Sequence, residues 1–437
     1  MPPIRNEQSP SLRFEGGGSS SASHRSNLDS GIVGSAQRRI PARSMWARVM
    51  DRIMAELGQP PFQVTLWTGE QVPAIAADPV ARLRVADSSS LLRLALDPHL
   101  QFGEMYSSGA LQVDGDLPGL LEAIYRGAYR EGGKTPWLRH LAQRLHRARR
   151  NSLDDARENI HQHYDLGNDF YALWLGRTMA YTCAYYCDPG TGLDDAQTAK
   201  MDHVCRKLRL RPGETVVEAG CGWGSFALHA ARSYGVKVRA FNISREQVAF
   251  ARERANVLGL ASRIEYIEDD YRNIGGRHDA FVSIGMLEHV GVENFADLGT
   301  VIQRCLSASG RGLIHTIGRT RPQPMNAWIE RRIFPGARPP SLGEMMKIFE
   351  PHECAVIDVE NLRLHYARTL EDWLDRFEKG RETVVRRFGE RFERTWRLYL
   401  AGSIAAFRTG DLQLFQVVFT TRGNNDVPWT RDFLYRQ

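Results

Sequence analysis

The sequence predicts an α/β protein, in which a largely parallel sheet with helices on both faces follows a small α+β domain. From Pro212 onward, apolar strand-like segments alternate with amphipathic helical segments. A glycine-rich turn joins the first of those strands to the helix after it, and a different pattern of short strands and helices precedes them. Alternation of this kind is typical of parallel sheets wrapped by helices.

Composition limits the class of protein. The 437 residues are 42% apolar, which is enough for two or three domains. The net charge of +6 is too small for a dedicated nucleic-acid binder. The six cysteines include no CxxC pair, so we expect a reducing compartment. No apolar run approaches the roughly 20 residues of a spanning helix, and the amino terminus lacks a secretory signal. We therefore expect a cytoplasmic protein whose membrane contact is peripheral.

The amino-terminal third divides into a tail and a small domain. Residues 1–44 are rich in Ser, Gly and Arg, which predicts a disordered tail. Residues 45–130 predict a small α+β domain, with strands in FQVTLW and ARLRVA and an amphipathic helix after the turn signals SSG and DGD. A stripe of apolar residues at helical spacing begins this domain: Trp46, Val49, Ile53 and Leu57. We find no catalytic constellation in it.

A basic linker, residues 131–155, separates this domain from the rest of the chain. Its segment 137–150 places Trp137, Leu138, Leu141 and Leu145 on one helical stripe. The remainder carries five arginines: Arg139, Arg144, Arg147, Arg149 and Arg150. A basic amphipathic helix can lie on an anionic lipid surface. The alternative is a solvated linker helix packed on its own protein.

The elements of residues 156–437 follow from the alternation. We expect strands in ETVVEA (214–219), VKVRAFN (236–242), IEYIEDD (264–270), AFVSIG (280–285) and RGLIHTIG (311–318). Helices are expected in SFALHAARSY (225–234), REQVAFARERANVL (245–258) and ENFADLGTVIQRCL (293–306), the first two closed by Gly235 and Gly259. Ligands of such sheets bind at the carboxyl ends of the strands. The polar residues expected at that edge are Glu218, Asn242, Asp269, Asp270, Tyr271, Glu288 and His289.

The glycine turn predicts a nucleotide-like ligand. Gly220, Gly222 and Gly224 form GxGxG, whose glycines permit a tight turn and a close ligand at a helix amino terminus. The spacing is shorter than in a dinucleotide site, and Asn242 stands where an acidic residue would bind ribose, which counts against NAD. Glu218 suits a cationic ligand such as S-adenosylmethionine. The loop resembles the first motif of class I methyltransferases, although a structural turn and an ordinary strand-end carboxylate are the alternatives.

Several further segments resemble the cyclopropane-fatty-acyl-phospholipid synthases, which include the mycolic acid cyclopropane synthases. They keep one order along the chain: NIHQHYDLGNDFYALWL (159–175), AYTCAYY (180–186), AGCGWG (219–224), NISREQ (242–247), GMLEHVG (285–291), HTIG (315–318), IFPGARPPS (333–341), LHYARTL (364–370) and FQVVFT (415–420). The resemblance implies a class I methyltransferase (Rossmann-like) mixed sheet with lipid-binding insertions over 156–437. Residues 45–130 are more loosely similar to the amino-terminal domain of the longer synthases.

The resemblance implies an enzyme that transfers the methyl group of S-adenosylmethionine to a cis double bond of a phospholipid acyl chain. Loss of a proton then closes a three-membered ring. The cofactor residues implied are Tyr181, Thr182, Gly220, Gly222, Asn242, Ile243, Gln247, Tyr271 and Arg272, with Glu218 orienting the glycine loop. Thr182, Asn242 and Tyr186 differ from the commoner residues of the family, which are Ser, Thr, and Trp or Phe.

A bound bicarbonate ion is the implied base. The positions that match its ligands are Cys183, Glu288, His315, Ile317 and Tyr366. His315 and the Tyr366 hydroxyl would donate hydrogen bonds, backbone N–H groups near Cys183 and Ile317 would add more, and Glu288 would accept the bicarbonate hydroxyl proton. Without the motifs around them, Cys183 would be interpreted as a small buried apolar residue and His315 as a core histidine.

Other interpretations remain beside this one. His161 and His163 could suggest a metal pair, but no Cys or His cluster completes a tetrahedral set, so we expect no metal. Phe170, Tyr171 and Trp174 are expected in the core or in an acyl-pocket wall. The substrate implies docking at the inner face of the cell membrane. A C-methyltransferase with methyl-branched or unsaturated products and a non-catalytic lipid-binding homologue are the alternatives, and homodimerisation is left open.

Overall fold

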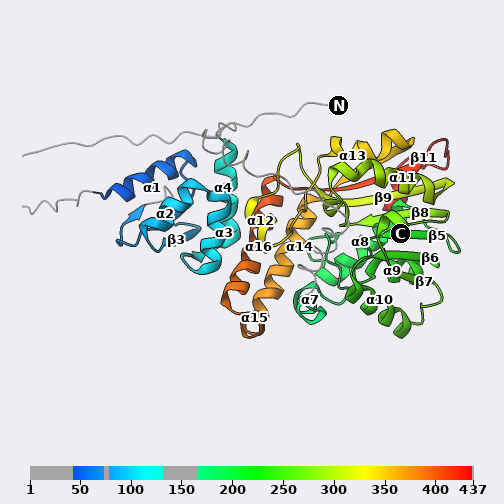
Figure 1. The fold of residues 1–437 in the computed structure, drawn as a ribbon, viewed down its shortest axis with the longest axis horizontal. Coiled ribbons are helices and arrows are strands. Elements are labelled where there is room, and N and C mark those ends of the chain that lie inside the picture. Colours follow the sequence, from blue (N-terminus) through cyan, green and yellow to red (C-terminus); the bar gives the residue numbers. More distant parts are fainter. Residues whose placement is uncertain (1–42, 73–77, 131–165, 436–437) are drawn as a thin grey trace, which may run out of the picture. The chain divides into compact units, whose positions relative to one another are not determined.

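The computed structural model describes residues 43–72, 78–130 and 166–435 (Figure 1). The expected tail up to residue 42, the basic segment 137–150, and His161 and His163 lie outside those ranges. Ser44, assigned to the tail from the sequence, caps the first helix because its Oγ accepts a hydrogen bond from the backbone N–H of Ala47. Residues from Ser44 onward form one compact unit.

The small domain is a four-stranded sheet with helices, as expected. Its strands are β1 (Phe62–Thr65), β2 (Gln71–Val72), β3 (Ala81–Val85) and β4 (Leu111–Gly115), in the order β2-β1-β3-β4. Its helices are α1 (Met45–Glu56), α2 (Ser88–Leu96), α3 (Pro98–Ser108) and α4 (Leu117–Arg130). The predicted strands FQVTLW and ARLRVA correspond to β1 and β3, and the helix after DGD corresponds to α4.

The predicted helix at α1 is confirmed, but its inner face is turned relative to the predicted stripe. The fully buried residues are Ala47, Met50 and Met54, whereas the side chain of Val49 is exposed. Trp46, Ile53 and Leu57 are only partly buried against the core. The two methionines lie four residues apart and so share one helix face, and they provide the inward contact that we assigned to Val49.

The larger part of the chain forms a seven-stranded sheet in the order β10-β11-β9-β8-β5-β6-β7. The strands are β5 (Thr215–Ala219), β6 (Lys237–Asn242), β7 (Ile264–Glu268), β8 (His278–Ile284), β9 (Leu306–Gly318), β10 (Cys354–Asn361) and β11 (Gln413–Thr421). From β7 to β9 all neighbours pair in parallel, whereas β11 pairs antiparallel with both β9 and β10. All five strands predicted from the sequence are confirmed, within a mixed sheet.

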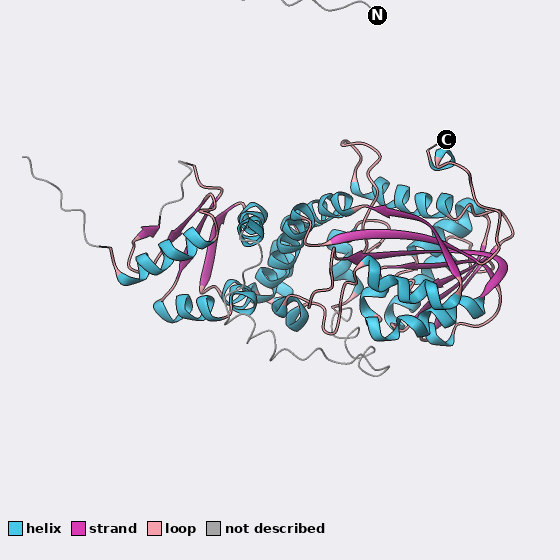
Figure 2. Cartoon of the chain, turned by 90° about the horizontal axis from the view of Figure 1, so that it is seen from above, coloured by secondary structure: helices cyan, strands magenta, loops and turns pink. Residues whose placement is uncertain are grey.

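Helices cover both faces of this sheet (Figure 2). The helices of this part of the chain are α7 (Asn168–Leu175), α8 (Leu193–Lys207), α9 (Ser225–Tyr234), α10 (Arg245–Val257), α11 (Phe295–Cys305), α12 (Ala327–Arg332), α13 (Leu342–Phe349), α14 (Arg363–Lys379), α15 (Arg381–Phe388) and α16 (Glu390–Thr409). Short 3₁₀ turns are η1 (Tyr271–Asn273), η2 (Leu287–His289), η3 (Val292–Asn294), η4 (Glu350–His352) and η5 (Asp432–Leu434). One apolar cluster joins the sheet to α8, α9 and α10, and another joins it to α11 and α13.

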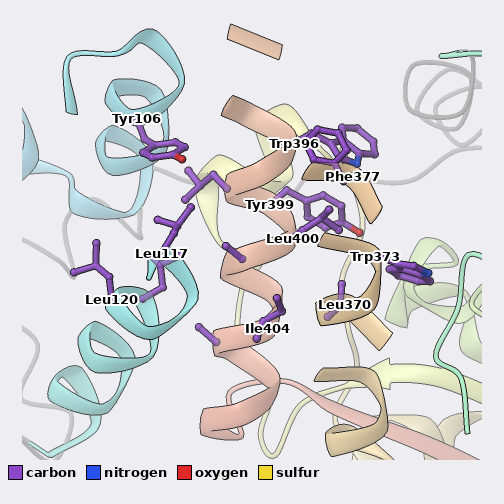
Figure 3. Close-up of a cluster of buried hydrophobic side chains, with 14 of the residues drawn as sticks. Tyr106, Leu117, Leu120, Leu370, Trp373, Phe377, Trp396, Tyr399, Leu400 and Ile404 are labelled. Carbon is purple, nitrogen blue, oxygen red and sulfur yellow. The ribbon is translucent and has the colours of Figure 1, made fainter. Parts of the chain in front are cut away.

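A third apolar cluster includes both the small domain and the larger part of the chain. In Figure 3, α16 lies between α3 and α4 on one side and α14 on the other. Its labelled members are Tyr106, Leu117, Leu120, Leu370, Trp373, Phe377, Trp396, Tyr399, Leu400 and Ile404. Among the described helices, none is long and apolar enough to cross a bilayer.

Candidate active site

A pocket opens at the carboxyl ends of strands β5, β6, β7 and β8, where the sequence predicts a ligand. Its empty space is about 1070 Å³, including the open mouth. All ten residues expected to bind or support the cofactor line it: Tyr181, Thr182, Glu218, Gly220, Gly222, Asn242, Ile243, Gln247, Tyr271 and Arg272. Residues that are distant in sequence are therefore brought to one cavity by the parallel strands.

The glycine loop after β5 has the backbone that its residues permit. Gly220 has φ of 81° and Gly222 has φ of 53°, in the left-handed region that favours glycine. The N–H groups of Gly220 and Cys221 donate to the carbonyl of Phe241, at 2.9 and 3.0 Å, which holds the loop against β6. A Cβ atom at Gly222 would meet nothing within 4 Å, so this position leaves open space for a ligand.

Asn242 is oriented by the groups around it at the end of β6. Its Nδ2 donates to Gln247 Oε1 at 2.7 Å and to the carbonyl of Gly222 at 3.3 Å. Its Oδ1 accepts from the N–H of Ser244, which caps α10. The side chains of Asn242 and Gln247 thus form a neutral hydrogen-bonding pair beside the glycine loop.

Tyr271 and Arg272 follow β7 in the turn η1. The carboxylate of Asp270 accepts a hydrogen bond from the Arg272 N–H at 2.9 Å and forms an ion pair with the Arg272 Nε at 3.8 Å. The guanidinium group of Arg272 lies 5.3 Å from the centre of the Tyr271 ring. These contacts fix both side chains at the pocket wall.

Glu218 and Lys200 are buried in the wall of the same pocket, and the sequence analysis identified only Glu218. Glu218 is 2% exposed, its Oε2 has no hydrogen-bond partner among the described residues, and burial raises its pKa to about 8. Lys200 on α8 is also 2% exposed; its Nζ donates to Thr182 Oγ1 at 2.9 Å, and burial lowers its pKa to about 8. A lysine on a helix that carries both polar and apolar residues is ordinarily exposed to solvent. The sequence therefore offered no reason to single out Lys200.

Aromatic side chains pack behind one wall of the pocket. Phe170, Tyr171 and Trp174 are completely buried, as expected for core residues. The Tyr171 ring lies 4.9 Å from that of Trp223, and the Trp174 ring lies 5.1 Å from that of Tyr181. Because Trp223 and Tyr181 line the pocket, this aromatic layer gives it an apolar wall.

Glu288 and Ile317, two of the five expected anion ligands, are in direct contact. A carboxylate oxygen of Glu288, in η2, accepts a hydrogen bond from the backbone N–H of Ile317 on β9. Its other oxygen, Oε2, is buried with no hydrogen-bond partner in the described part of the chain. Burial raises the pKa of Glu288 to about 7, so this carboxyl group exchanges a proton near neutral pH.

His315 lies on the same face of β9 as Ile317, two residues earlier. Its Nδ1 is 3.1 Å from Gln416 Nε2 on the neighbouring strand β11, and its Nε2 has no partner among the described residues. Burial, reinforced by the positive charge of Lys200, holds the pKa of His315 well below its usual value. His315 is therefore a neutral imidazole.

Cys183 and Tyr366 belong to one buried cluster, and Ile317 packs against it. The Cys183 thiol is fully buried, and burial raises its pKa far above the usual value, so it is neutral. The Tyr366 ring, on α14, contacts the rings of Trp373 and Phe407. Neither residue is among those that line the pocket, and the same holds for Glu288, His315 and Ile317.

Two backbone N–H groups expected to face the anion are already engaged. Ile317 donates to Glu288, and Ala184, beside Cys183, donates to Thr369 Oγ1 at 3.0 Å. These two groups are therefore not available donors, which corrects that detail of the expectation. In the described residues, no group of three or more His, Cys, Asp or Glu side chains is placed to hold a metal ion.

The fold and the pocket define a class of protein. A seven-stranded sheet in which β11 runs antiparallel to the other described strands, with a glycine loop after β5, is the architecture of class I S-adenosylmethionine-dependent methyltransferases. The chain belongs to the mycolic acid cyclopropane synthetase family, whose sequence model matches residues 151–417. Residues 49–130 match a separate domain family of unknown function.

Relatives with known names agree with this assignment. The chain is 34% identical over 393 residues to a probable fatty acid methyltransferase of Pseudomonas putida, covering 86% of this chain and 96% of the relative. It is 34% identical to the cyclopropane-fatty-acyl-phospholipid synthase of Escherichia coli K12, covering 81% of this chain and 91% of the relative.

Solved structures agree with the assignment as well. The cyclopropane synthase MmaA2 from Mycobacterium tuberculosis matches with a TM-score of 0.58 and 28% identity, covering 61% of this chain and 98% of that one. The mycolic acid cyclopropane synthase CmaA1, complexed with S-adenosylhomocysteine and CTAB, also matches with a TM-score of 0.58, at 29% identity and the same coverage.

Proposed function

We propose that this enzyme cyclopropanates cis double bonds in the acyl chains of membrane phospholipids, with S-adenosylmethionine as methyl donor and bicarbonate as base. The observation that carries the proposal is the buried Glu288 carboxyl group: one oxygen accepts a hydrogen bond from the Ile317 N–H, on the strand that also carries His315, and the other has no hydrogen-bond partner among the described residues. The name of the Escherichia coli relative supports the phospholipid substrate.

The pocket fits S-adenosylmethionine by its chemistry. The unpaired oxygen of Glu218 offers an acceptor to a cationic group, and Gly222 leaves space for a ligand at the loop. When bound, the cofactor supplies an electrophilic methyl group. The glycine loop, Asn242 and Gln247 orient it, and the wall formed by Tyr181 and Trp223 excludes water from an alkene that is a weak nucleophile.

We assign the bicarbonate ion to the site formed by Cys183, Glu288, His315, Ile317 and Tyr366, in which the side chains of Glu288, His315 and Tyr366 would contact the ion and the Ile317 N–H holds Glu288. Methyl transfer to the alkene leaves a carbocation on the acyl chain, and loss of one proton from it closes the ring, for a net gain of CH₂. Neutral His315 presents an N–H donor, and ionised Glu288 accepts the hydroxyl proton of the ion. Apolar surroundings at Cys183 keep water from the carbocation.

An enzyme that acts on phospholipids in a bilayer must bind at the membrane surface. We assign that contact to the basic segment 137–150, outside the described residues, and place the enzyme at the inner face of the cell membrane. The five arginines would attract anionic headgroups. Replacing all five with glutamine should weaken sedimentation with vesicles rich in phosphatidylglycerol. Unchanged sedimentation would refute this role.

Incubation with S-adenosylmethionine and monounsaturated phospholipid vesicles tests the reaction. We expect acyl chains heavier by one CH₂ that resist ozonolysis, because a cyclopropane has no alkene to cleave. The name of the Pseudomonas putida relative favours one alternative, a C-methyltransferase. Products with the same added mass that ozone cleaves would indicate this alternative. If no S-adenosylhomocysteine forms, the proposed reaction fails and the other alternative, a non-catalytic lipid-binding homologue, is favoured.

A further inference from the structure

Lys200 is a buried ammonium group in the wall of the cofactor pocket. It lies on α8 one turn after Gln197, whose Nε2 donates to the carbonyls of Thr182 at 2.8 Å and Ala180 at 3.4 Å. The two side chains together hold the segment 180–182 against the helix. Because Ala180, Tyr181 and Thr182 all line the pocket, α8 shapes it through these contacts.

The hydrogen bonds of Lys200 leave donors for a ligand. An ammonium group has three N–H donors, and Lys200 makes one hydrogen bond to the described residues, to Thr182 Oγ1 at 2.9 Å. Since that oxygen accepts from Lys200, the Thr182 hydroxyl proton is directed to another acceptor. Lys200 and Thr182 are thus adjacent donors that suit the oxygens of a carboxylate.

The charges in the pocket suit a zwitterion. Lys200 and Glu218 are both buried in its wall, and although their charges attract each other, no ion pair within 4.0 Å joins them in the described structure. Buried charges are costly unless a partner of opposite sign is near, and burial has shifted both pKa values to about 8. Arg272, another cation of the wall, is already paired with Asp270.

We propose that Lys200, with the Thr182 hydroxyl, binds the α-carboxylate of the methionyl part of S-adenosylmethionine, while Glu218 accepts from its α-ammonium group. A ligand with both charges satisfies both buried residues at once. Lys200 is then a determinant of cofactor selectivity, because it distinguishes ligands that have the carboxylate from those that lack it. The proposal depends on the cofactor alone and holds whatever the acyl product is.

Calorimetric titration of the full chain with two ligands tests this assignment. The ligands are S-adenosylhomocysteine and its decarboxylated analogue, S-adenosyl-3-thiopropylamine. We expect the wild type to bind the carboxylate-bearing ligand about 10- to 100-fold more tightly, the range for charge-assisted hydrogen bonds. Lys200→Met should reduce this ratio to about one, mainly by weakening S-adenosylhomocysteine, and Lys200→Arg should keep part of it.

Lys207→Met is the matched control. Lys207 lies on the same helix and is also buried, but it pairs with Glu360 at 2.6 Å and is outside the pocket wall. This variant should keep the wild-type ratio. A merely structural lysine would weaken both ligands equally, so an unchanged ratio in Lys200→Met, or equal affinities in the wild type, would overturn the proposal. Should Lys200→Met not fold, Lys200→Gln carries the same test.

The ligand ratio and the lipid product separate this inference from the proposed function. If the ratio collapses in Lys200→Met while the wild type makes no cyclopropane, the assignment of Lys200 stands and the proposed reaction fails. If cyclopropane forms and the ratio is unchanged in Lys200→Met, the reverse holds.

Discussion

At the scale of single residues, burial determines which groups in the site carry charge. Glu288 has its pKa raised to about 7, whereas His315 and Cys183 are held neutral by the same loss of solvent. Only Glu288 of these three therefore changes charge near neutral pH. Among these three, Glu288 is the group whose ionisation we expect in the pH dependence of kcat near pH 7, below the pKa of about 8 of Glu218 and Lys200 in the cofactor pocket.

We expect Glu288→Gln to lower kcat by at least about 100-fold, because the amide cannot take up a proton from the ion. The affinity for S-adenosylhomocysteine should change little, since Glu288 is outside the pocket wall. Wild-type kcat should rise with pH through about 7, as Glu288 ionises. Steady-state kinetics and calorimetry check this, with the exposed Glu293→Gln as control. An active variant would contradict the role of Glu288 as acceptor.

The same carboxyl group links stability to pH. Its pKa is raised from 4.5 to about 7 on folding, so the protonated form stabilises the fold below pH 4.5, and that contribution is lost as pH rises through 7. Glutamine does not ionise and can still accept from the Ile317 N–H. The free energy of unfolding of Glu288→Gln should therefore exceed that of the wild type by up to about 3 kcal/mol at pH 8, and by less at pH 5. Chemical denaturation at the two pH values measures this difference. An equal difference in unfolding free energy at pH 5 and pH 8 would contradict this role of Glu288.

At the scale of elements, close helix packing determines where a side chain can be added. Gly103 on α3 is buried, and a Cβ atom there would lie 2.3 Å from the Trp328 ring on α12. Gly402 on α16 is also helical, but a Cβ atom there would meet nothing within 4 Å. The same substitution should thus have opposite effects at these two glycines.

Gly103→Ala should destabilise the protein by about 1–3 kcal/mol, because overpacking outweighs the gain in helix propensity. Gly402→Ala should stabilise it by up to about 1 kcal/mol, because alanine favours the helix and has room. Chemical denaturation of both variants measures the two changes. Stabilisation by Gly103→Ala would mean that Trp328 moves aside freely.

The elements that could be predicted from sequence are those whose pattern is local. Strands β5 to β9 and the helices between them follow from hydrophobic period and closing glycines, as at Gly235. The inner face of α1 could not be predicted, because partly buried and fully buried apolar residues look alike in a sequence. Lys200 was missed because its burial against Thr182 is a tertiary contact that leaves no trace in the helix pattern.

At the scale of the whole molecule, the small domain and the catalytic part share one core. Leu120 on α4 is completely buried in the cluster that includes Leu400 and Ile404 of α16 (Figure 3). A defect on either side of this contact therefore exposes apolar surface of the other. We infer that the two parts unfold together.

Leu120→Ala should cost about 2–5 kcal/mol, from lost burial and the cavity left behind. The loss should appear in one transition, in which helical circular dichroism and S-adenosylhomocysteine binding disappear at the same temperature. A thermal scan with both signals checks this. If binding persists after part of the helical signal is lost, the small domain unfolds alone and the shared core does not couple the two parts.

The position of β11 affects how the chain is made. This strand comes after β9 and β10 in the sequence, yet it lies between them in the sheet. Until residues 413–421 have been synthesised, β9 has a neighbour only at its β8 edge and β10 has no neighbouring strand in the sheet. Both then present unpaired backbone groups, which can pair with other chains. Because Gln416 on β11 also contacts His315, the surroundings of this histidine are complete only once β11 has paired between β9 and β10.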